Sequence, residues 1–263
     1  MKKSKGTILK IILGLVLLFL YLPIVYTIVF SFNSSKSLSV FKGFSLKWYE
    51  KMFNSGEIMD AIFYTIIVAV LTTVISTVVG TITAIGMSKS KKVIRKSIEQ
   101  INDFPIMNPE IVTAIGLLMF FSAVAIRKGF VTMLLAHIMF CIPYVILSIM
   151  PKLRSLDPNL IDAALDLGAT PMQALWKVII PEVRPGMISG FMLALTLSID
   201  DFAVTVFTIG NQGLETLSTY IYADARKGGL TPELRPLSAI IFVVVLALLI
   251  AINYRAGKTQ KKD

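Results

Sequence analysis

Six long apolar segments constrain the fold of this sequence more than any other feature. A helix needs about 20 mostly apolar residues to cross the hydrocarbon core of a bilayer. The segments that meet or approach this length cover residues 8–32, 61–87, 104–125, 130–150, 187–209 and 237–254. Hydrophobic residues make up 55% of the chain and charged residues only 16%, which excludes an ordinary soluble domain. We therefore predict an all-α membrane protein with six transmembrane helices.

The basic residues predict how these helices are oriented. Most of the 26 lysines and arginines lie in the terminal regions, the second-to-third connection and the fourth-to-fifth connection, and loops rich in these residues stay in the cytoplasm. Both termini and the connection at 151–186 are therefore expected to be cytoplasmic. The net charge of +10 fits contact with anionic lipid, and no other feature supports nucleic-acid binding.

This orientation divides the chain into four parts. Residues 1–32 form a cytoplasmic tail and the first helix, 33–60 an extracytoplasmic loop, 61–254 the membrane core and 255–263 a second cytoplasmic tail. The first apolar segment follows three lysines, as in a signal peptide. It is too long for a typical signal core and no small-residue cleavage site follows it, so we expect an uncleaved membrane anchor.

The connection around residues 157–186 is polar and is predicted to form two short helices joined at a glycine. Asp157 is a good N-cap for the first helix, and Gly168 occupies the position where a left-handed residue ends it. One face of this helix is polar, formed by Asn159, Asp162 and Asp166. A capped amphipathic hairpin inside a membrane protein is expected to dock onto a partner.

The second helix of the hairpin is predicted to begin at Thr170 and to end at two prolines. Thr170 is a good cap, and proline suits the position that follows it. An apolar stripe is formed by Met172, Leu175, Trp176 and Ile179. Pro181 and Pro185 lack the main-chain N–H that continues a helix, and we expect them to end this one.

No sequence pattern predicts catalysis or a metal site. A nucleophile–base pair, a Walker loop and a glycine-rich phosphate cradle are all missing from the sequence. Cys141 lies one turn after His137 and formally makes a ligand pair, but a packed cysteine and a hydrogen-bonded histidine are the favoured interpretation. We expect no enzyme activity, metal or cofactor in this chain. If transport consumes ATP, a partner ATPase binds the ATP and its Mg²⁺.

The spacing within the hairpin resembles the EAA loop of binding-protein-dependent ABC importer permeases. That loop reads Glu-Ala-Ala, three residues, Gly, nine residues, Ile, any residue and Leu-Pro. The matching residues here are Asp162-Ala163-Ala164, Gly168-Ala169 and Val178-Ile179-Ile180-Pro181. Asp replaces Glu, Val replaces Ile and Ile replaces Leu, all conservatively. The resemblance covers nearly the whole chain and implies the type I permease fold, with 61–254 as the permease core and 151–186 as its coupling loop.

Other phrases resemble the polyamine branch of this family. The first, at residues 107–112, reads Met-Asn-Pro-Glu-Ile-Val, and the second, at residues 198–202, reads Ser-Ile-Asp-Asp-Phe. Together with segments in the outer loops, they are similar to the second permease subunit of spermidine/putrescine importers. This match rests on fewer residues than the match to the importer family as a whole.

The resemblance implies a multi-subunit complex in the cell membrane. Its other members are a homologous second permease subunit, two cytoplasmic ATPase subunits and an extracellular polyamine-binding protein. The residues it implicates in ATPase coupling are Asp162, Ala163, Ala164, Asp166, Gly168, Ala169 and Pro181. In that complex the first hairpin helix sits in a cleft on the ATPase and moves when ATP binds. The alternative is a surface or re-entrant helix that only stabilises its loop.

A polyamine path needs carboxylates or aromatic faces, because the substrate carries two or more positive charges. Acids inside spanning helices are costly and usually functional. The candidates are Asp200, Asp201 and Glu110, with Phe202 and Phe207 as aromatic neighbours. Three alternatives stay open. Asp201 serves helix packing or a subunit contact, Glu110 favours a helix N-terminus through the helix dipole, and the aromatic residues belong to an interface belt or the core.

The sequence thus predicts a permease subunit for ATP-driven import of spermidine and putrescine. Within the same class, the alternative substrates are thiamine, ferric iron or an opine-like amine. From a different class, the alternative is a stand-alone channel or secondary transporter.

Overall fold

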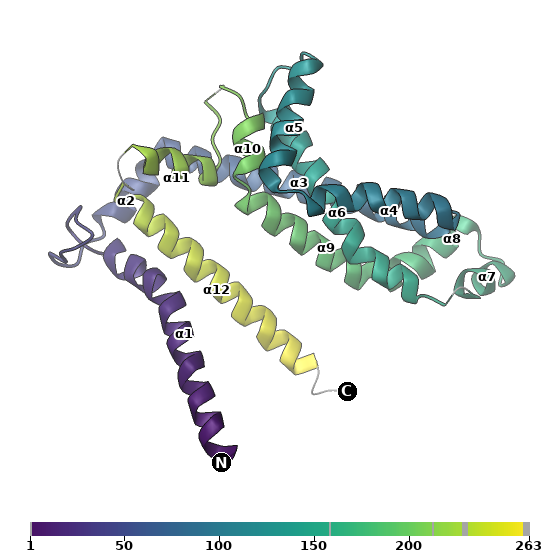
Figure 1. Ribbon diagram of the computed structural model, residues 1–263, viewed down its shortest axis with the longest axis horizontal. Coiled ribbons are helices and arrows are strands. Elements are labelled where there is room, and N and C mark those ends of the chain that lie inside the picture. The colour runs from purple at the N-terminus through teal and green to yellow at the C-terminus, as the bar shows by residue number, and fades with distance from the viewer. Residues whose placement is uncertain (1, 158, 212, 228–230, 260–263) are drawn as a thin grey trace. The chain divides into compact units, whose positions relative to one another are not determined.

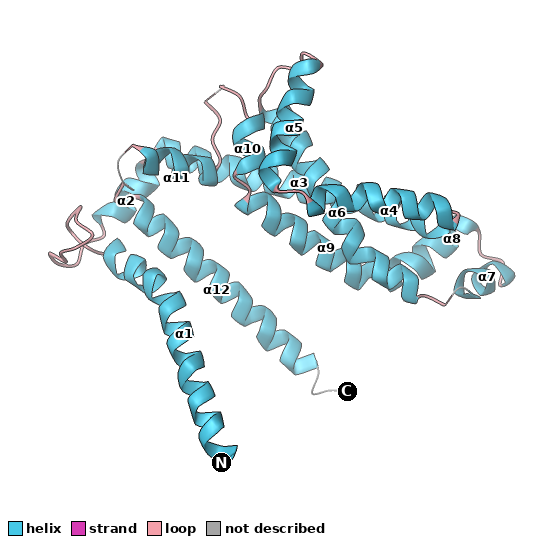
Figure 2. Ribbon diagram, in the orientation of Figure 1, coloured by secondary structure: helices cyan, strands magenta, loops and turns pink. Residues whose placement is uncertain are grey.

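The computed structural model describes residues 2–157, 159–211, 213–227 and 231–259, which form helices joined by loops (Figure 2). An isolated antiparallel bridge pairs Asn33 with Phe44. The all-α prediction is confirmed for this part of the chain. The chain divides into two compact units, one made of residues 1–59 and 221–263 and the other of residues 60–220.

The first unit is built around two long helices that pack together (Figure 1). These are α1 (Lys2–Ser31) and α12 (Leu234–Thr259), and the short helix α2 (Lys47–Asn54) also contacts α12. Tyr21 and Phe242 meet edge to face between α1 and α12, with ring centroids 6.5 Å apart. α12 continues past residue 254, the predicted end of the core, and residues 260–263 lie outside the described residues.

The loop between α1 and α2 is ordered by polar contacts. The indole N–H of Trp48 donates to the main-chain oxygen of Asn33 at 2.7 Å. From the start of α12, the guanidinium of Arg235 donates to the main-chain oxygens of Ser35 and Lys36. The predicted extracytoplasmic loop 33–60 is thereby joined to the start of α12, which lies far from it in the sequence.

The second unit holds the hairpin and the predicted core up to residue 220, whereas residues 221–254 of that predicted core belong to the first unit. Its elements are α3 (Gly56–Lys89), α4 (Lys92–Met107), α5 (Glu110–Ala123), α6 (Phe130–Ser155), α7 (Asn159–Asp166), α8 (Pro171–Ala174), a π-helical turn (Leu175–Ile179), α9 (Ile180–Asp200), α10 (Ala203–Thr208) and α11 (Leu217–Arg226). The first residues of α3 and the last of α11 belong to the other unit.

The core of this unit lies where α6 packs along α9 (Figure 1). Two glycines of α9 permit the close approach. A Cβ atom at Gly186 would lie 2.9 Å from the main-chain oxygen of Ser148, and one at Gly190 would lie 3.2 Å from Cα of Val145. Small residues at such a crossing increase the van der Waals contact between helices, which drives helix association in membranes.

The predicted spans are confirmed in part. Among the described residues, four helical stretches are long and apolar enough to cross a membrane, namely Leu9–Ser31, Gly56–Lys89, Phe130–Ser155 and Pro171–Asp200. α4 and α5 would make a fifth only if this bent pair counts as one span. The sixth predicted segment falls in the helix α12, of which the stretch searched among the described residues is Leu234–Val244, so this span stays a prediction. Among the described residues, length and composition thus support four or five of the six predicted spans.

Two of the predicted continuous segments are broken, which corrects the sequence interpretation. Segment 104–125 is divided between α4 and α5, which are bent by 107°. Asn108 is extended there, with ψ of 146°, because the ring of Pro109 disfavours a helical residue before it. Segment 187–209 is divided at Asp201, where ψ of 130° ends α9 before α10 begins.

Candidate functional sites

The hairpin is fixed by the local contacts that its sequence predicts. The Asp157 carboxylate accepts a hydrogen bond from the main-chain N–H of Asn159 at 2.9 Å. Gly168 has φ of +84°, and the N–H groups of Gly168 and Ala169 bond back to Leu165 and Ala164. This is the double-bonded Schellman ending of a helix. Pro158 lies outside the described residues.

The start of the second hairpin helix is also confirmed. The hydroxyl of Thr170 accepts from the N–H of Gln173 at 3.3 Å, and the Gln173 side chain accepts from the N–H of Thr170 at 3.0 Å. This reciprocal capping box satisfies two main-chain donors that a helix start leaves unpaired.

The prediction that this helix ends at its two prolines is wrong. The π-helical turn follows α8 directly and continues into α9, which contains Pro181 and Pro185. Pro181 lies in the first turn of α9, where its missing N–H costs least, and the wider π turn before it accommodates the ring. A continuous helical path therefore connects the hairpin to Asp200, the last residue of α9.

The first hairpin helix, α7, has the predicted two-sided character. Its exposed residues are Asn159, Leu160, Asp162, Ala163, Leu165 and Asp166, and its half-buried residues are Ile161 and Ala164. α7 packs against α8 and the π-helical turn. The acidic side chains thus face outward while Ile161 faces the rest of the unit.

The turn and the second helix expose an apolar patch that the sequence interpretation missed. Leu167, Met172 and Trp176 are 89%, 62% and 63% exposed. Leu175 and Ile179 point inward instead, so the predicted apolar stripe is divided between the two sides of the helix. Among the other predicted coupling residues, Gly168 and Pro181 are exposed and Ala169 is half-buried.

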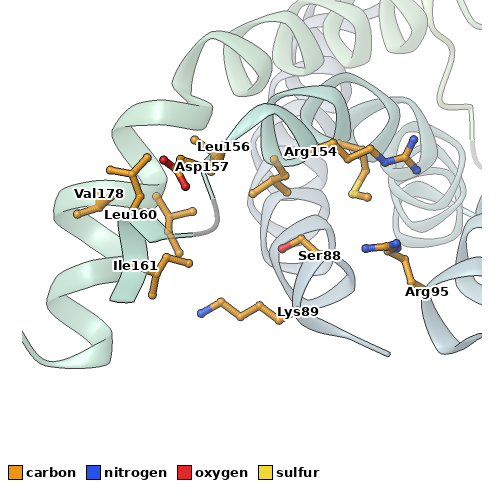
Figure 3. Close-up of a pocket in the computed structure, with 12 residues that line it drawn as sticks. Ser88, Lys89, Arg95, Arg154, Leu156, Asp157, Leu160, Ile161 and Val178 are labelled. Atoms are coloured by element: carbon orange, nitrogen blue, oxygen red, sulfur yellow. The ribbon is translucent and has the colours of Figure 1, made fainter. Parts of the chain in front are cut away.

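A cleft of about 330 Å³ lies between the hairpin, the end of α3, the start of α4 and the end of α6 (Figure 3). These helix ends are predicted to face the cytoplasm. Ile161 of α7 and the basic residues Lys89, Arg95 and Arg154 line it. Glu99 of α4 accepts from Arg154 of α6 at 2.6 Å and lies 3.9 Å from Arg95. α7 borders this cleft, and none of its described side chains is fully buried.

The three predicted path acids meet at the two helix breaks. Glu110 is the first residue of α5, Asp200 is the last residue of α9, and Asp201 follows it in the gap before α10. α10 packs against α5, which brings Glu110 within electrostatic reach of both aspartates. Glu110 and Asp200 are exposed. Residues 90 positions apart in the sequence thus form one acidic cluster.

Asp201 differs from its neighbours because its side chain caps a helix. It is only 4% exposed, and its carboxylate accepts from the N–H groups of Val204 and Thr205 at 3.2 and 2.7 Å. The hydroxyl of Thr205 donates to it at 2.7 Å, and His137 Nε2 lies 3.3 Å away. These contacts favour the helix-packing alternative for Asp201. They also confirm that His137 is a hydrogen-bonded histidine.

The aromatic candidates are packed in part and keep part of their surface exposed. Phe202 and Phe207 are half-buried, and Phe207 packs on the core between α6 and α9. The sequence interpretation missed Tyr144, which is half-buried, lies within electrostatic reach of Glu110 and meets Phe140 edge to face at 5.5 Å. Its position one turn after Phe140 in an apolar segment does not indicate that an acid lies nearby.

Comparisons with known sequences agree with these features. The family model described as binding-protein-dependent transport system inner membrane component matches residues 76–256. The spermidine/putrescine transport system permease protein PotC of Haemophilus influenzae is 36% identical over 88% of this chain and 90% of its own length. The putrescine transport system permease protein PotI of Escherichia coli is 34% identical over 92% of this chain and 88% of its own length.

Solved structures share the fold. One is a bacterial ABC transporter involved in the import of the acidic polysaccharide alginate, with a TM-score of 0.75 and 16% identity over 97% of this chain and 96% of the solved chain. Another is the methionine transporter MetNI in an inward-facing conformation, with a TM-score of 0.57 and 16% identity over 76% of this chain and 94% of the solved chain. The predicted importer permease fold is confirmed, and the chain belongs to the family of binding-protein-dependent transport system inner membrane components.

Proposed function

We propose that this chain is a non-catalytic permease subunit of an ATP-driven importer for spermidine and putrescine, forming half of the translocation path. Its sequence similarity to polyamine permeases over about nine-tenths of its length carries the proposal. A homologous second permease forms the other half. Two ATPase subunits bind ATP and Mg²⁺, and an extracellular binding protein delivers the polyamine. Both termini and the hairpin face the cytoplasm.

The hairpin couples this subunit to its ATPase. Asp162 and Asp166 meet polar groups of the ATPase cleft, and the exposed patch of Leu167, Met172 and Trp176 gives the contact an apolar centre. When the ATPases close, α7 moves over the adjoining cleft. The continuous path through the π-helical turn and α9 carries this movement to Asp200. The positive φ of Gly168 keeps the two hairpin helices at the angle that docking requires.

The acidic cluster attracts the substrate. Two unit charges 4 Å apart attract by about 4 kcal/mol at the effective dielectric constant of about 20 near a protein surface. The exposed carboxylates of Glu110 and Asp200 bind successive ammonium groups, while Asp201 adds its charge without contact. Phe202, Phe207 and Tyr144 offer aromatic faces for the methylene chain and the ammonium groups.

Reconstitution of the complete complex in proteoliposomes tests this function. With ATP enclosed beside the ATPases and the binding protein outside, spermidine uptake is expected to be saturable and to stop without ATP. Unlabelled putrescine should compete, and thiamine and ferric iron should not. Uptake of thiamine or ferric iron in place of spermidine would overturn the proposed substrate assignment. Spermidine transport by the chain alone, without an ATPase, would identify a channel or secondary transporter instead.

A further inference from the structure

The only histidine of the chain lies beside the α9–α10 break. His137, in α6, is 1% exposed and contacts residues on both sides of the break. Its Nδ1 lies 2.9 Å from Oγ of Ser198 in α9, and its Nε2 lies 2.8 Å from Oγ1 of Thr205 in α10. Ser198 and Thr205 bracket the acids Asp200 and Asp201. One buried imidazole therefore joins three helices around the acidic cluster.

The direction of these hydrogen bonds follows from the groups involved. The carboxylate of Asp201 only accepts, so the hydroxyl of Thr205 donates to it. Because the hydroxyl hydrogen of Thr205 is used in this bond, the Thr205 Oγ1 atom accepts a hydrogen bond from Nε2 of His137. When the imidazole carries its hydrogen on Nε2 alone, Nδ1 accepts and Ser198 donates there. The chain of donors runs in one direction, from Ser198 through His137 and Thr205 to Asp201, and every member is paired.

We propose that His137 is a positioning residue for the cation path, holding Asp201 as the cap of α10 so that Asp200 is presented toward Glu110. Resting on the proposed transport of ammonium groups, this assigns His137 a role in substrate affinity although it touches no substrate. The hydroxyl of Ser218 also donates to the main-chain oxygen of Asp201. Both the side chain and the main chain of the break are thus held, which fixes the direction of the neighbouring Asp200 side chain.

Two amide substitutions separate this role from simple packing. The side-chain nitrogen of glutamine reaches the position of imidazole Nε2, whereas the asparagine amide ends near Nδ1, where its oxygen accepts from Ser198. His137→Gln therefore keeps the donor to Thr205, whereas His137→Asn keeps only the contact with Ser198. We expect His137→Asn to raise the KM for spermidine uptake by about tenfold, as for a lost hydrogen bond beside a charge. His137→Gln should stay within about twofold of the parent KM.

The KM for spermidine uptake, measured together with the amount of assembled complex, distinguishes positioning from a structural defect. A purely structural defect lowers the amount of complex, and hence the maximum rate, without changing KM. Cys141→Ala is the matched control, because Cys141 lies one turn further along α6 and its thiol contacts Ala194 of α9 at 3.7 Å, outside the donor chain. Its KM should equal that of the parent. Equal KM values for the two amide variants, or a change confined to the maximum rate, would overturn the proposal.

A second pair of variants decides the matter if the histidine variants fail to assemble. Thr205→Ser keeps the linking hydroxyl, and Thr205→Val removes it at nearly constant volume. The valine variant should raise KM by about tenfold and the serine variant should not; equal values in this pair would refute the positioning role. A parent complex that takes up no spermidine would instead refute the proposed function, an outcome distinct from all of these.

Discussion

Gly168 offers the sharpest test of the hairpin as a coupling element. Its φ of +84° lies in the left-handed region, and no atom lies within 4 Å of the position that a Cβ would occupy. Substitution by alanine therefore meets no steric clash with neighbours and costs only the backbone strain, about 1–2 kcal/mol. The effect of Gly168→Ala on the hairpin is thus isolated from packing.

The strain energy is large compared with the stabilisation that α7 gains from its packing contacts. This helix has eight residues, none of them fully buried, and it packs mainly against α8 and the π-helical turn, so little tertiary packing compensates for strain at its end. Because 1.4 kcal/mol corresponds to a factor of ten in population, the fraction of hairpins in the docking conformation should fall by about tenfold. ATP-driven uptake should fall in proportion, while membrane insertion stays unchanged.

The matched control is Gly168→Asn. Asparagine adopts the left-handed conformation more readily than alanine, so its uptake should lie between that of the parent and that of the alanine variant. The assay is initial spermidine uptake in proteoliposomes, normalised to the permease present, together with co-purification of the ATPase. Full uptake by Gly168→Ala, or lower uptake by Gly168→Asn than by Gly168→Ala, would refute the reasoning from backbone conformation.

Three further predictions follow from the site and the core. Asp200→Asn should raise the KM for spermidine by about tenfold with ATPase association unchanged. Asp201→Ala should instead lower the melting temperature of the permease in detergent, since losing a helix cap costs about 0.5–2 kcal/mol. The reverse pattern would contradict the roles given to the two aspartates. Gly186→Ala should destabilise the α6–α9 contact by about 1–3 kcal/mol, measured by thermal unfolding, while Gly116→Ala, with no atom within 4 Å of its Cβ position, should be neutral. Trp176→Ser should weaken co-purification of the ATPase without lowering the melting temperature, and unchanged co-purification would exclude the apolar patch from the interface.

The sequence predicts the hairpin well because its determinants are local. The Asp157 cap, the left-handed Gly168 and the Thr170–Gln173 capping box each depend on residues within a few positions of one another. The prolines at 181 and 185 were misleading for the opposite reason. Whether a proline ends a helix depends on the turn before it, and the π-helical turn is not visible as a sequence pattern.

The helix breaks were missed because hydropathy averages over about 20 residues. Pro109 offers a local signal for the first break, since proline disfavours a helical residue before it. The break at Asp201 has no proline and lies between apolar stretches. The sequence does place Glu110 and Asp200 among the path candidates. Their proximity depends on the packing of α10 against α5, which no local pattern encodes.

At the break between α9 and α10, the Asp201 carboxylate and the first N–H groups of α10 supply each other's hydrogen-bond partners. In a membrane, a helix that restarts leaves its first N–H groups without acceptors, and a carboxylate there lacks donors. Asp201 pairs the two, accepting from the N–H groups of Val204 and Thr205. Releasing this carboxylate to bind a cation would uncap α10, a cost that the exposed Asp200 and Glu110 do not carry. Adjacent aspartates that look equivalent in sequence therefore have different surroundings, and we propose that cation binding falls to Asp200 with Glu110.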